Sequence, residues 1–421
     1  MARDWLGVEL RPWQQYAADR ILEVDKDGRL RWPFVVLTVG RQQGKSTLLA
    51  ALSVWRMLQA GHFGEPQHVT SVSQSIQVAR QYWMPVALDV RERDLGRSQV
   101  ASGMEYVQLA DGSGWRLLPA KMRKGYTSSL VVVDEAWTVD REVVEQALMP
   151  QMIQRDQAQM LIVSTAGEES SDLLSTFRDR ALAGDRDTLL LEWSAPPEAD
   201  ADDENGWQWA LPVWDAKRRA WYRRLRAATS ETAWQVEYMN QWVRAVDGWV
   251  SRREWMAGHR PHTPGSNGVC VVDQALHGEA WGAVWASQPE DGDPQATVVR
   301  AYRSARAPQV WEWVRGLPDS VDVRIGVTVN GRQPDDIPVN GVCGSRELKA
   351  GIRAVQSAIR AGMVWHDNDQ LLTEHVLRSV ARTTPNGQTV FHVGGPPDDL
   401  SRMLVIAVDL VGKRQRGPVM V

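Results

Sequence analysis

A glycine-rich segment between a predicted strand and a predicted helix constrains the fold of this chain more than any other feature. Residues 34–39 (FVVLTV) form a short β-branched run, the loop VGRQQGKST follows at 39–47, and an Ala- and Leu-rich helical pattern continues to Gly61. When a glycine-rich loop joins a strand to a helix, the backbone N–H groups of the loop and of the helix N-terminus point to one place. Phosphate groups bind there. The segment therefore predicts a phosphate-binding loop of the P-loop type.

Three residues of this loop have the chemistry that nucleotide binding requires. Gly44 belongs to the backbone that surrounds the phosphates, Lys45 would reach the β- and γ-phosphates, and the Ser46 hydroxyl would bind Mg²⁺. The loop departs from the usual pattern because Val39 holds the first glycine position and Gly40 sits beside it. A purely structural glycine turn is the alternative, and the strand–loop–helix context argues against it.

A second apolar run ends in two adjacent acids. In LVVVDEAW at 130–137, a strand that looks buried leads to Asp134 and Glu135. Asp134 can hold Mg²⁺ through water, and Glu135 can orient and deprotonate an attacking water. An acidic helix N-cap is the alternative. A third run, LIVSTAG at 161–167, matches a segment that couples the γ-phosphate to neighbouring elements in motor ATPases, or it is a plain strand and turn.

The pattern along the first half is typical of a parallel sheet covered by helices. Further β-rich runs at 68–73 and 160–164 have helical stretches between them. Residues 195–206 contain two prolines and five acids, which predicts an exposed connector. Residues 207–245 are helical in pattern and basic in places.

The pattern restarts in the second half of the chain. Residues 267–273, 279–287 and 296–304 read as three successive strands joined by short turns. A helix at 308–316, a strand at 321–329, and then further helices and a short strand follow, ending in a helix from about 399. Three strands followed by alternating helices and strands favour an RNase H-like α/β domain.

Composition excludes several classes of protein. The chain is 43% apolar and 24% charged, as globular proteins are, and 421 residues are enough for two domains. Cys270 and Cys343 cannot form a disulfide framework or a dedicated zinc site. No apolar run is as long as a membrane span, and the first residues lack the pattern of a signal peptide, so we expect a cytoplasmic protein.

The motifs together resemble those of the large terminase subunit of tailed bacteriophages. The resemblance rests on the Arg-containing loop GRQQGKS, on DEA after an apolar strand, and on STAG downstream. It implies that Gln14 in LRPWQ reads the adenine edge and that Arg41 senses the γ-phosphate. Arg123 in GSGWRLLPAKMRKG would act in trans in a ring, although a solvated surface charge is an equal alternative. The expected nucleotide contacts are Gln14, Gly40, Gln43, Gly44, Lys45, Ser46, Thr47 and Asp134.

The same resemblance implies an RNase H-like nuclease with two metal ions in the second half. Its first acid would be Asp273, Glu279 matches a frequent acidic position, and the last acid would be Asp399 or its neighbour Asp398. Two metal ions need several converging carboxylates. The middle acid is not evident, because Asn330 stands near its place and Asp335 and Asp336 come later. We expect Asp409 to face elsewhere, and His366 and Asp367 to have a structural role.

The resemblance predicts a packaging motor with three segments. Residues 1–195 would form an ASCE-type P-loop ATPase domain, 196–255 a linker or helical subdomain, and 256–421 the nuclease domain. ATP and Mg²⁺ would be cofactors, with Mg²⁺ or Mn²⁺ at the nuclease site. Double-stranded DNA, the portal of a procapsid, the small terminase subunit and further copies in a ring would be partners in the host cytoplasm. A helicase-like ATPase with weak or no nuclease activity and a non-catalytic docking component remain as alternatives.

The net charge of −4 does not exclude DNA as a partner. Residues 207–260 contain ten Lys and Arg against five Asp and Glu, so basic surface is concentrated locally. Sequence-independent phosphate contacts need only such a local surface. The charge distribution therefore predicts a weak and transient grip on DNA.

Overall fold

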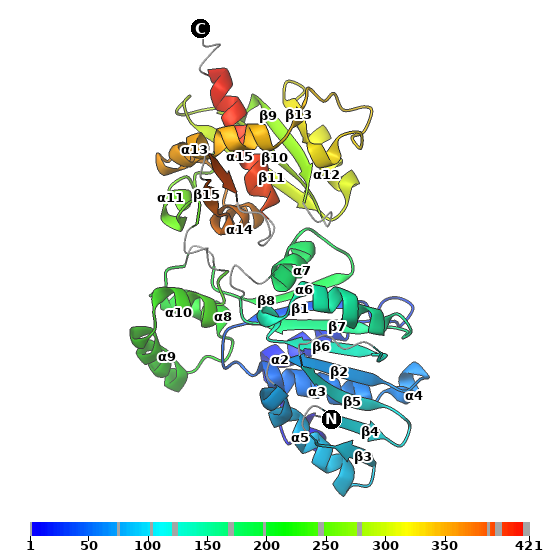
Figure 1. The fold of residues 1–421 in the computed structure, drawn as a ribbon. Helices are drawn as coiled ribbons and strands as arrows, with labels where there is room; N and C mark the ends of the chain where they lie inside the picture. Colours follow the sequence, from blue (N-terminus) through cyan, green and yellow to red (C-terminus); the bar gives the residue numbers. More distant parts are fainter. Residues whose placement is uncertain are drawn as a thin grey trace. The chain divides into compact units, whose positions relative to one another are not determined.

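The chain divides into two compact units (Figure 1). The first comprises residues 1–178 and 186–242, and the second comprises 179–185 and 243–421, so the division passes through one helix, α7 (Asp172–Leu182). The computed structural model describes residues 2–73, 76–101, 104–119, 125–166, 172–196, 199–242, 248–275, 280–384, 388–391 and 398–415.

An eight-stranded sheet forms the centre of the first unit, in the order β3-β4-β5-β2-β6-β7-β1-β8. The six strands from β5 to β8 in this order run parallel, and β3 and β4 form an antiparallel edge. One strand, β7, lies between β1, which leads into the glycine-rich loop, and β6, which carries the two acids; this additional strand is typical of ASCE ATPases. The strands are β1 (Phe34–Val39), β2 (His68–Ser73), β3 (Gly96–Gln99), β4 (Tyr106–Leu109), β5 (Gly114–Pro119), β6 (Leu130–Asp134), β7 (Gln159–Ser164) and β8 (Thr188–Trp193).

Helices cover both faces of this sheet because its central strands are apolar on both sides. Val35 and Leu37 of β1 pack with helices α2, α3 and α5, whereas Val36 packs on the opposite face with Leu174 and Phe177 of α7. The helices before α7 are α1 (Ala2–Leu6), α2 (Pro12–Ile21), α3 (Lys45–Met57), α4 (Ala60–Phe63), α5 (Ile76–Glu92) and α6 (Arg141–Val143). Short helical turns η1 (Ala136–Thr138), η2 (Val144–Leu148) and η3 (Met149–Met152) flank α6.

Three helices complete the first unit with a small core of their own. They are α8 (Glu204–Ala210), α9 (Ala216–Ala228) and α10 (Glu231–Glu237), and Trp207, Tyr222 and Trp234 are buried among them. The exposed connector predicted at 195–206 is wrong for the described part of that segment. Ala195, Ala199 and Ala201 are buried in this core, because the small side chains alternate with the acids that face water.

A mixed six-stranded sheet forms the centre of the second unit, in the order β13-β12-β9-β10-β11-β14. Strands β9, β10 and β11 form an antiparallel meander, and β12 and β13 lie parallel on the far side of β9. In chain order the first five strands therefore lie as 3-2-1-4-5, which is the order of an RNase H-like sheet. The strands are β9 (Pro264–Gln274), β10 (Trp281–Pro289), β11 (Thr297–Ser304), β12 (Asp322–Gly326), β13 (Val342–Cys343) and β14 (Val364–Trp365), and β15 (Ala381–Thr383) pairs separately with β16 (Thr389–Phe391).

Alternating residues of β9 face two different cores. Val269 and Val271 pack with α13, α14 and α15, whereas Cys270 and Val272 pack with α12 on the other face. The predicted strand at 321–329 is shorter than expected, because it ends at Gly326 and Val327–Val329 form a short helical turn, η4. The helices are α11 (Arg252–Met256), α12 (Ala307–Arg315), α13 (Ser345–Arg360), α14 (Gln370–Arg378) and α15 (Asp399–Gln415).

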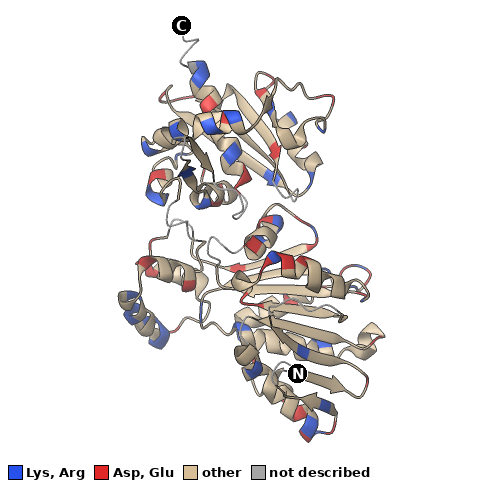
Figure 2. Cartoon of the chain, in the orientation of Figure 1, with Lys and Arg blue, Asp and Glu red and all other residues tan. Residues whose placement is uncertain are grey.

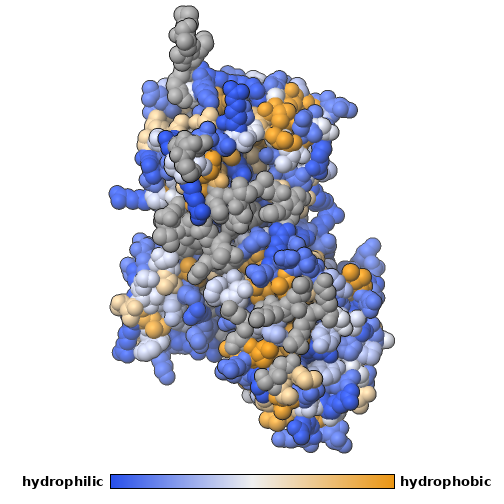
Figure 3. All heavy atoms as spheres, viewed as in Figure 1, coloured by the Kyte–Doolittle hydropathy of each residue, from blue (hydrophilic) through white to orange (hydrophobic). Residues whose placement is uncertain are grey.

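The surface is that of a globular protein. Hydrophilic side chains predominate on the face drawn in Figure 3, and apolar ones gather in separate patches. Within the described parts of the chain, no helix has the length and apolar character that crossing a membrane requires.

Candidate functional site

The glycine-rich loop connects the end of β1 at Val39 to the start of α3 at Lys45. Gly44 precedes the helix with a φ of 100°, in the left-handed region that favours glycine. A Cβ atom at this position would also lie 2.9 Å from Nε2 of Gln14. The conformation therefore requires glycine at this point of the loop, and a larger side chain would also displace the flexible end of Gln14.

Lys45 points back across the loop, because its Nζ donates a hydrogen bond to the carbonyl of Val39 at 2.9 Å. Burial lowers the pKa of Lys45 to about 8, and the negative charge of Asp134 opposes this shift. Glu237 and Glu135 also raise the pKa, whereas Arg41 lowers it. The charged groups predicted for nucleotide chemistry thus lie close enough to Lys45 to affect its proton.

Asp134 ends β6 and is buried. Burial raises its pKa to about 6, Lys45 opposes that shift, and the adjacent Glu135 adds to it. Glu135 follows with a φ of 55°, and its N–H donates to Oδ1 of Asp134 at 3.0 Å. A carboxylate at a strand end beside the loop that carries Ser46 has the oxygen chemistry that Mg²⁺ prefers, so these residues fit that ion.

Gln14 lies beside the loop and contacts its backbone. Its Nε2 donates to the carbonyl of Gly44 at 2.8 Å, and its Oε1 accepts from the N–H of Arg11 at 2.7 Å. One N–H and one lone pair of the amide remain for another partner. The expectation that Gln14 reads an adenine edge stays a prediction, and a role in holding the loop is added to it.

The helical segment α8–α10 holds the first half of the loop, which sequence reasoning missed. Gln43 is buried, donates from Nε2 to the Tyr222 hydroxyl at 2.9 Å, and accepts from the Val213 N–H at 2.9 Å. A Cβ at Gly40 would lie 2.6 Å from the carbonyl of Tyr238. No local signal at 40–43 could have revealed partners that lie about 170 residues later.

Arg41 is bound to the same segment. Its N–H donates to the carbonyl of Glu237 at 2.8 Å, and its guanidinium pairs with the Glu237 carboxylate. Just over half of the Arg41 side chain is exposed (53%), so the guanidinium can reach solvent or a ligand beside the loop. Sensing of a γ-phosphate by Arg41 stays a prediction, and it would require exchange of Glu237 for phosphate.

Asn240 links three strands at the edge of the sheet that carries the loop. Its Nδ2 donates to Thr38 Oγ1 at 3.1 Å and to the carbonyl of Trp193 at 2.9 Å, and its Oδ1 accepts from the N–H of Ala166 at 2.5 Å. The side chain is fully buried. Ala166 belongs to the STAG segment, so this amide connects β1, β8 and the end of β7.

Two predicted site residues lie outside the described residues. These are Arg123, predicted to act in trans, and Glu279, predicted as a nuclease acid. Ser46 and Thr47 lie in the first turn of α3, directly after Lys45.

Asp273 lies at the end of β9, as the predicted first nuclease acid would. Burial raises its pKa, and the nearby negative charge of Asp399 adds to the shift. Its carboxylate accepts hydrogen bonds from the Gln274 N–H at 2.9 Å and from the Thr328 hydroxyl. A threonine hydroxyl thus contacts Asp273 from the segment after the fourth strand, where the resemblance implies a carboxylate.

The candidates for the middle acid do not converge on Asp273 in this structure. Asn330 and Asp335 are exposed, and Asp336 pairs with Arg315 of α12 at 2.7 Å. Asp409 pairs with Lys413 one turn along α15, and its Cβ lies beside Gly351 of α13.

The last predicted acids are already paired. Asp398 accepts from Arg402 at 2.7 Å, and Asp399 accepts from Nε of Arg303 at 2.9 Å. Among the described residues, no group of three or more His, Cys, Asp and Glu side chains could hold a metal ion. The described carboxylates therefore do not fit a two-metal centre, and the metal roles of Asp273, Glu279, Asp398 and Asp399 stay predictions.

His366 has the contacts of a structural residue. Its ring stacks on Trp255 with 4.0 Å between centroids, and its Nε2 lies 2.9 Å from the Trp255 carbonyl. Burial lowers its pKa to about 4, so it is neutral at physiological pH.

No protein-family model matches the sequence. No curated protein matches it either. Among solved structures, the HK97 bacteriophage large terminase is 16% identical and superimposes with a TM-score of 0.52 over 96% of this chain and 95% of that one. The large terminase of a thermophilic bacteriophage in complex with ADP is 13% identical, with a TM-score of 0.43 over 97% of this chain and 100% of that one. The ATPase domain of the Thermus phage P74-26 large terminase is 18% identical, with a TM-score of 0.40 over 57% of this chain and 97% of that one.

The likeness to the HK97 protein carries the conclusion about the fold. It extends over nearly the whole of both chains, so it includes the α/β domain with the glycine-rich loop and the domain with the mixed sheet. The resemblance that the motifs indicated is therefore confirmed at the level of the fold. The chain has the fold of a bacteriophage large terminase, with an α/β domain of the ATPase type followed by a domain of the RNase H-like nuclease type.

Proposed function

We propose that this chain is a terminase large subunit that hydrolyses ATP to drive double-stranded DNA into a procapsid. The observation that carries the proposal is the cluster of Lys45, Asp134, Glu135 and Arg41 at one edge of the parallel sheet, where their charges act on one another. Parallel α/β sheets bind ligands at this edge, beyond the carboxyl ends of the strands. The fold shared with the HK97 large terminase supports the same function.

Each residue of the cluster has a separate task in this proposal. Lys45 exchanges its bond to the Val39 carbonyl for the β- and γ-phosphates, and Ser46 and Asp134 would hold Mg²⁺. That ion would neutralise charge on the phosphates. Glu135 orients the attacking water and accepts its proton.

Two arginines would complete the site, one in the loop and one from a neighbouring copy. Arg41 leaves Glu237 to contact the γ-phosphate. Arg123 would reach the site of a neighbouring copy, which makes a ring the working assembly. The portal of the procapsid and the small terminase subunit are the further partners that this function requires.

DNA contact by the first unit would use its basic helical segment. Helix α9 has the sequence AKRRAWYRRLRAA, and Figure 2 shows Lys and Arg along it. Part of this charge is compensated, because Arg219 and Arg223 both pair with Glu204. A partly neutralised basic surface favours weak contacts with phosphates, which a motor must release at each step.

The second unit favours a variant of this function. The resemblance to large terminase subunits implies that this domain cuts concatemeric DNA as a metal-dependent endonuclease. The pairing of Asp399 with Arg303 and the hydroxyl of Thr328 beside Asp273 favour a DNA-dependent ATPase with weak or no nuclease activity. Incubation of supercoiled and linear plasmid with Mg²⁺ or Mn²⁺ separates the two, because only the endonuclease shortens linear DNA.

Replacement of Lys45 tests the motor function directly. We expect Lys45→Ala to abolish ATP hydrolysis both with and without DNA, because the ammonium group that neutralises the β- and γ-phosphates is removed. The readout is phosphate release at saturating DNA. Lys26→Ala removes a lysine in an exposed turn and serves as the matched control. Full DNA-stimulated activity in Lys45→Ala would refute the nucleotide site, and a wild-type rate that DNA leaves unchanged would favour the non-catalytic docking component.

A further inference from the structure

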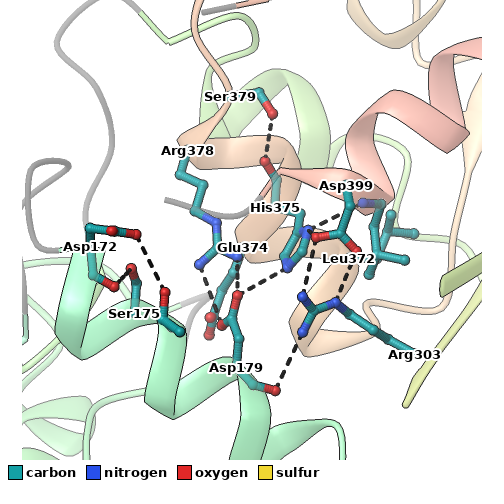
Figure 4. A network of polar contacts seen from close by, with 12 residues as sticks. Asp172, Ser175, Asp179, Arg303, Leu372, Glu374, His375, Arg378, Ser379 and Asp399 are labelled. Atoms are coloured by element: carbon teal, nitrogen blue, oxygen red, sulfur yellow. Dashed lines mark hydrogen bonds and ion pairs between the residues drawn. The ribbon is translucent and has the colours of Figure 1, made fainter. Parts of the chain in front are cut away.

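A buried network of charges surrounds Asp399 in the second unit (Figure 4). Asp399 is the first residue of α15, Arg303 comes from β11, His375 and Arg378 come from α14, and Asp179 lies near the end of α7. Side-chain exposure is 6% for Asp399, 2% for Arg303 and 0% for His375. Such deep burial of charged groups is stable only when they are paired and hydrogen-bonded.

Arg303 binds Asp399 with both arms of its guanidinium. Nε lies 2.9 Å from Oδ2 and Nη2 lies 3.2 Å from Oδ1, so both carboxylate oxygens accept a bond from the same arginine. Nη1 of Arg303 also donates to the backbone carbonyl of Asp179 at 3.4 Å. The guanidinium therefore has fixed partners on two sides.

His375 lies between the two carboxylates as a neutral ring. Its Nδ1 accepts from the N–H of Leu400 at 3.3 Å, which places the ring proton on Nε2, 3.3 Å from Oδ2 of Asp179. A ring that accepts at Nδ1 and carries its proton on Nε2 is the neutral imidazole. Nδ1 also lies 3.7 Å from Oδ1 of Asp399, so an imidazole occupies the space beside that oxygen.

The charges of this network balance without any added ion. Asp179 pairs with Arg378, Asp399 pairs with Arg303, and His375 accepts a hydrogen bond at Nδ1 as a neutral ring does. A divalent ion at Asp399 would have to displace the buried guanidinium of Arg303 from the carboxylate that it binds with both arms. Separating the partners of a buried pair in this way is strongly unfavourable.

Asp273 does not compensate for this loss. Gly282, which pairs with Asp273 across β9 and β10, would direct a Cβ to 3.6 Å from Oδ2 of Asp399, so the two acids lie over neighbouring strands. From the segment after β12, the described residue Thr328 contacts Asp273 with a hydroxyl and not with a carboxylate. Asp398 is paired as well, with Arg402. Among the described candidates this leaves the carboxylate of Asp273 with a hydroxyl, which are too few to hold two closely spaced divalent ions.

We propose that Asp399 is the structural counter-ion of Arg303 and not a metal ligand, so that this domain binds no pair of divalent ions through Asp273 and Asp399. The proposal deepens the proposed function, on which it rests, because it assigns the second domain of the motor to a role other than two-metal cleavage. Asp399, Arg303 and His375 are then residues that stabilise the domain and fix the start of α15.

Metal binding and thermal stability of the full-length chain without nucleotide test this assignment. Binding of Mn²⁺ is measured by electron paramagnetic resonance, and the melting temperature is measured with and without Mn²⁺, for the wild type and for Asp399→Asn. We expect Asp399→Asn to lower the metal-free melting temperature, because Arg303 loses the negative charge with which it pairs. We expect its Mn²⁺ binding to equal that of the wild type, whether the wild type binds one ion or none.

Two further variants serve as references. Asp409→Asn removes an acid from the same helix that pairs with the half-exposed Lys413, so we expect a smaller fall in melting temperature. Arg303→Lys keeps the charge but loses the two-armed contact, so it should fold with a lower melting temperature and unchanged Mn²⁺ binding. It keeps the test informative if Asp399→Asn fails to fold.

Three results would overturn the proposal. The first is loss of Mn²⁺ binding in Asp399→Asn, the second is a metal-free melting temperature in that variant at or above the wild-type value, and the third is tighter Mn²⁺ binding in Arg303→Lys. None of them depends on ATP turnover, so failure of this assignment is distinguishable from failure of the motor function, which Lys45→Ala tests.

Discussion

Charged side chains are removed from water both at the P-loop, where Asp134 is buried and Lys45 is partly buried, and around Asp399, yet their pKa values shift in opposite senses in the two places. In the first unit the pKa of Lys45 falls to about 8 and that of Asp134 rises to about 6, so each shifts toward its neutral form. In the second unit arginines more than offset burial and hold the pKa values of Asp179 and Asp399 below their usual range. At the P-loop, nearby opposite charges do not offset the cost of burying Lys45 and Asp134, as is expected of a site that binds a charged ligand. Around Asp399, each carboxylate is already paired with an arginine, so no ligand is needed to balance the charge.

Replacement of Asp179 should produce the largest effect that follows from this comparison. Asp179→Asn removes the buried carboxylate charge that pairs with Arg378, and we expect the free energy of unfolding to fall by about 3–5 kcal/mol. Urea unfolding of the full chain measures the loss. Asp336→Asn breaks an exposed pair with Arg315 and should cost no more than about 1 kcal/mol. Equal losses in the two variants would contradict the distinction between the network and an ordinary surface pair.

Replacement of Lys45 should have the opposite sign. A lysine whose pKa falls from 10.5 to about 8 on folding destabilises the folded state at pH 7. Methionine has a similar length and no charge, so we expect Lys45→Met to raise the free energy of unfolding by about 1–3 kcal/mol while nucleotide binding is lost. Urea unfolding at pH 7 without nucleotide measures the change. A destabilised variant would mean that the lysine contributes to the fold and is not held there for a ligand.

The pH dependence of nucleotide binding should show a smaller and graded effect. The ammonium form of Lys45 binds phosphate, and bound phosphates raise its pKa above the free value of about 8. Affinity is therefore full below pH 8 and falls as the pH rises through 8, by at most about tenfold per pH unit, with uptake of a proton on binding. Titration calorimetry in two buffers of different ionisation enthalpy measures both quantities. A constant affinity from pH 7 to about pH 9 would contradict the assignment.

The local parts of the nucleotide site could be predicted from the sequence, because strand, loop and acid are each encoded within a few neighbouring residues. The partners of Gln43 and Arg41 could not, because Tyr222 and Glu237 follow far along the chain in a basic helical segment that has no local signal for contact with the loop. In residues 195–206, three alanines are buried although the acids and prolines of this segment predicted an exposed connector.

The second site shows the same limit. The strands of the meander follow from alternation, but the end of β12 does not, since the β-branched residues Val327 and Val329 belong to a helical turn and not to the strand. The sequence pattern therefore placed Asn330 near the position of the middle acid, whereas Thr328 is the residue that contacts Asp273. The pair of Arg303 and Asp399 joins a strand to a helix across the domain, and no spacing rule predicts it.

The amide of Asn240 also sets an order of events during synthesis of the chain. The ends of β1 and β7 are made early, but the side chain that joins them to β8 is made only after α10. A nascent chain that has not yet released residue 240 from the ribosome therefore lacks the clamp at the edge of its sheet, and the partners of Gln43 appear only shortly before it. Because domains made of contacts distant in sequence fold late, the phosphate-binding loop acquires its supports only when the whole first unit has been translated.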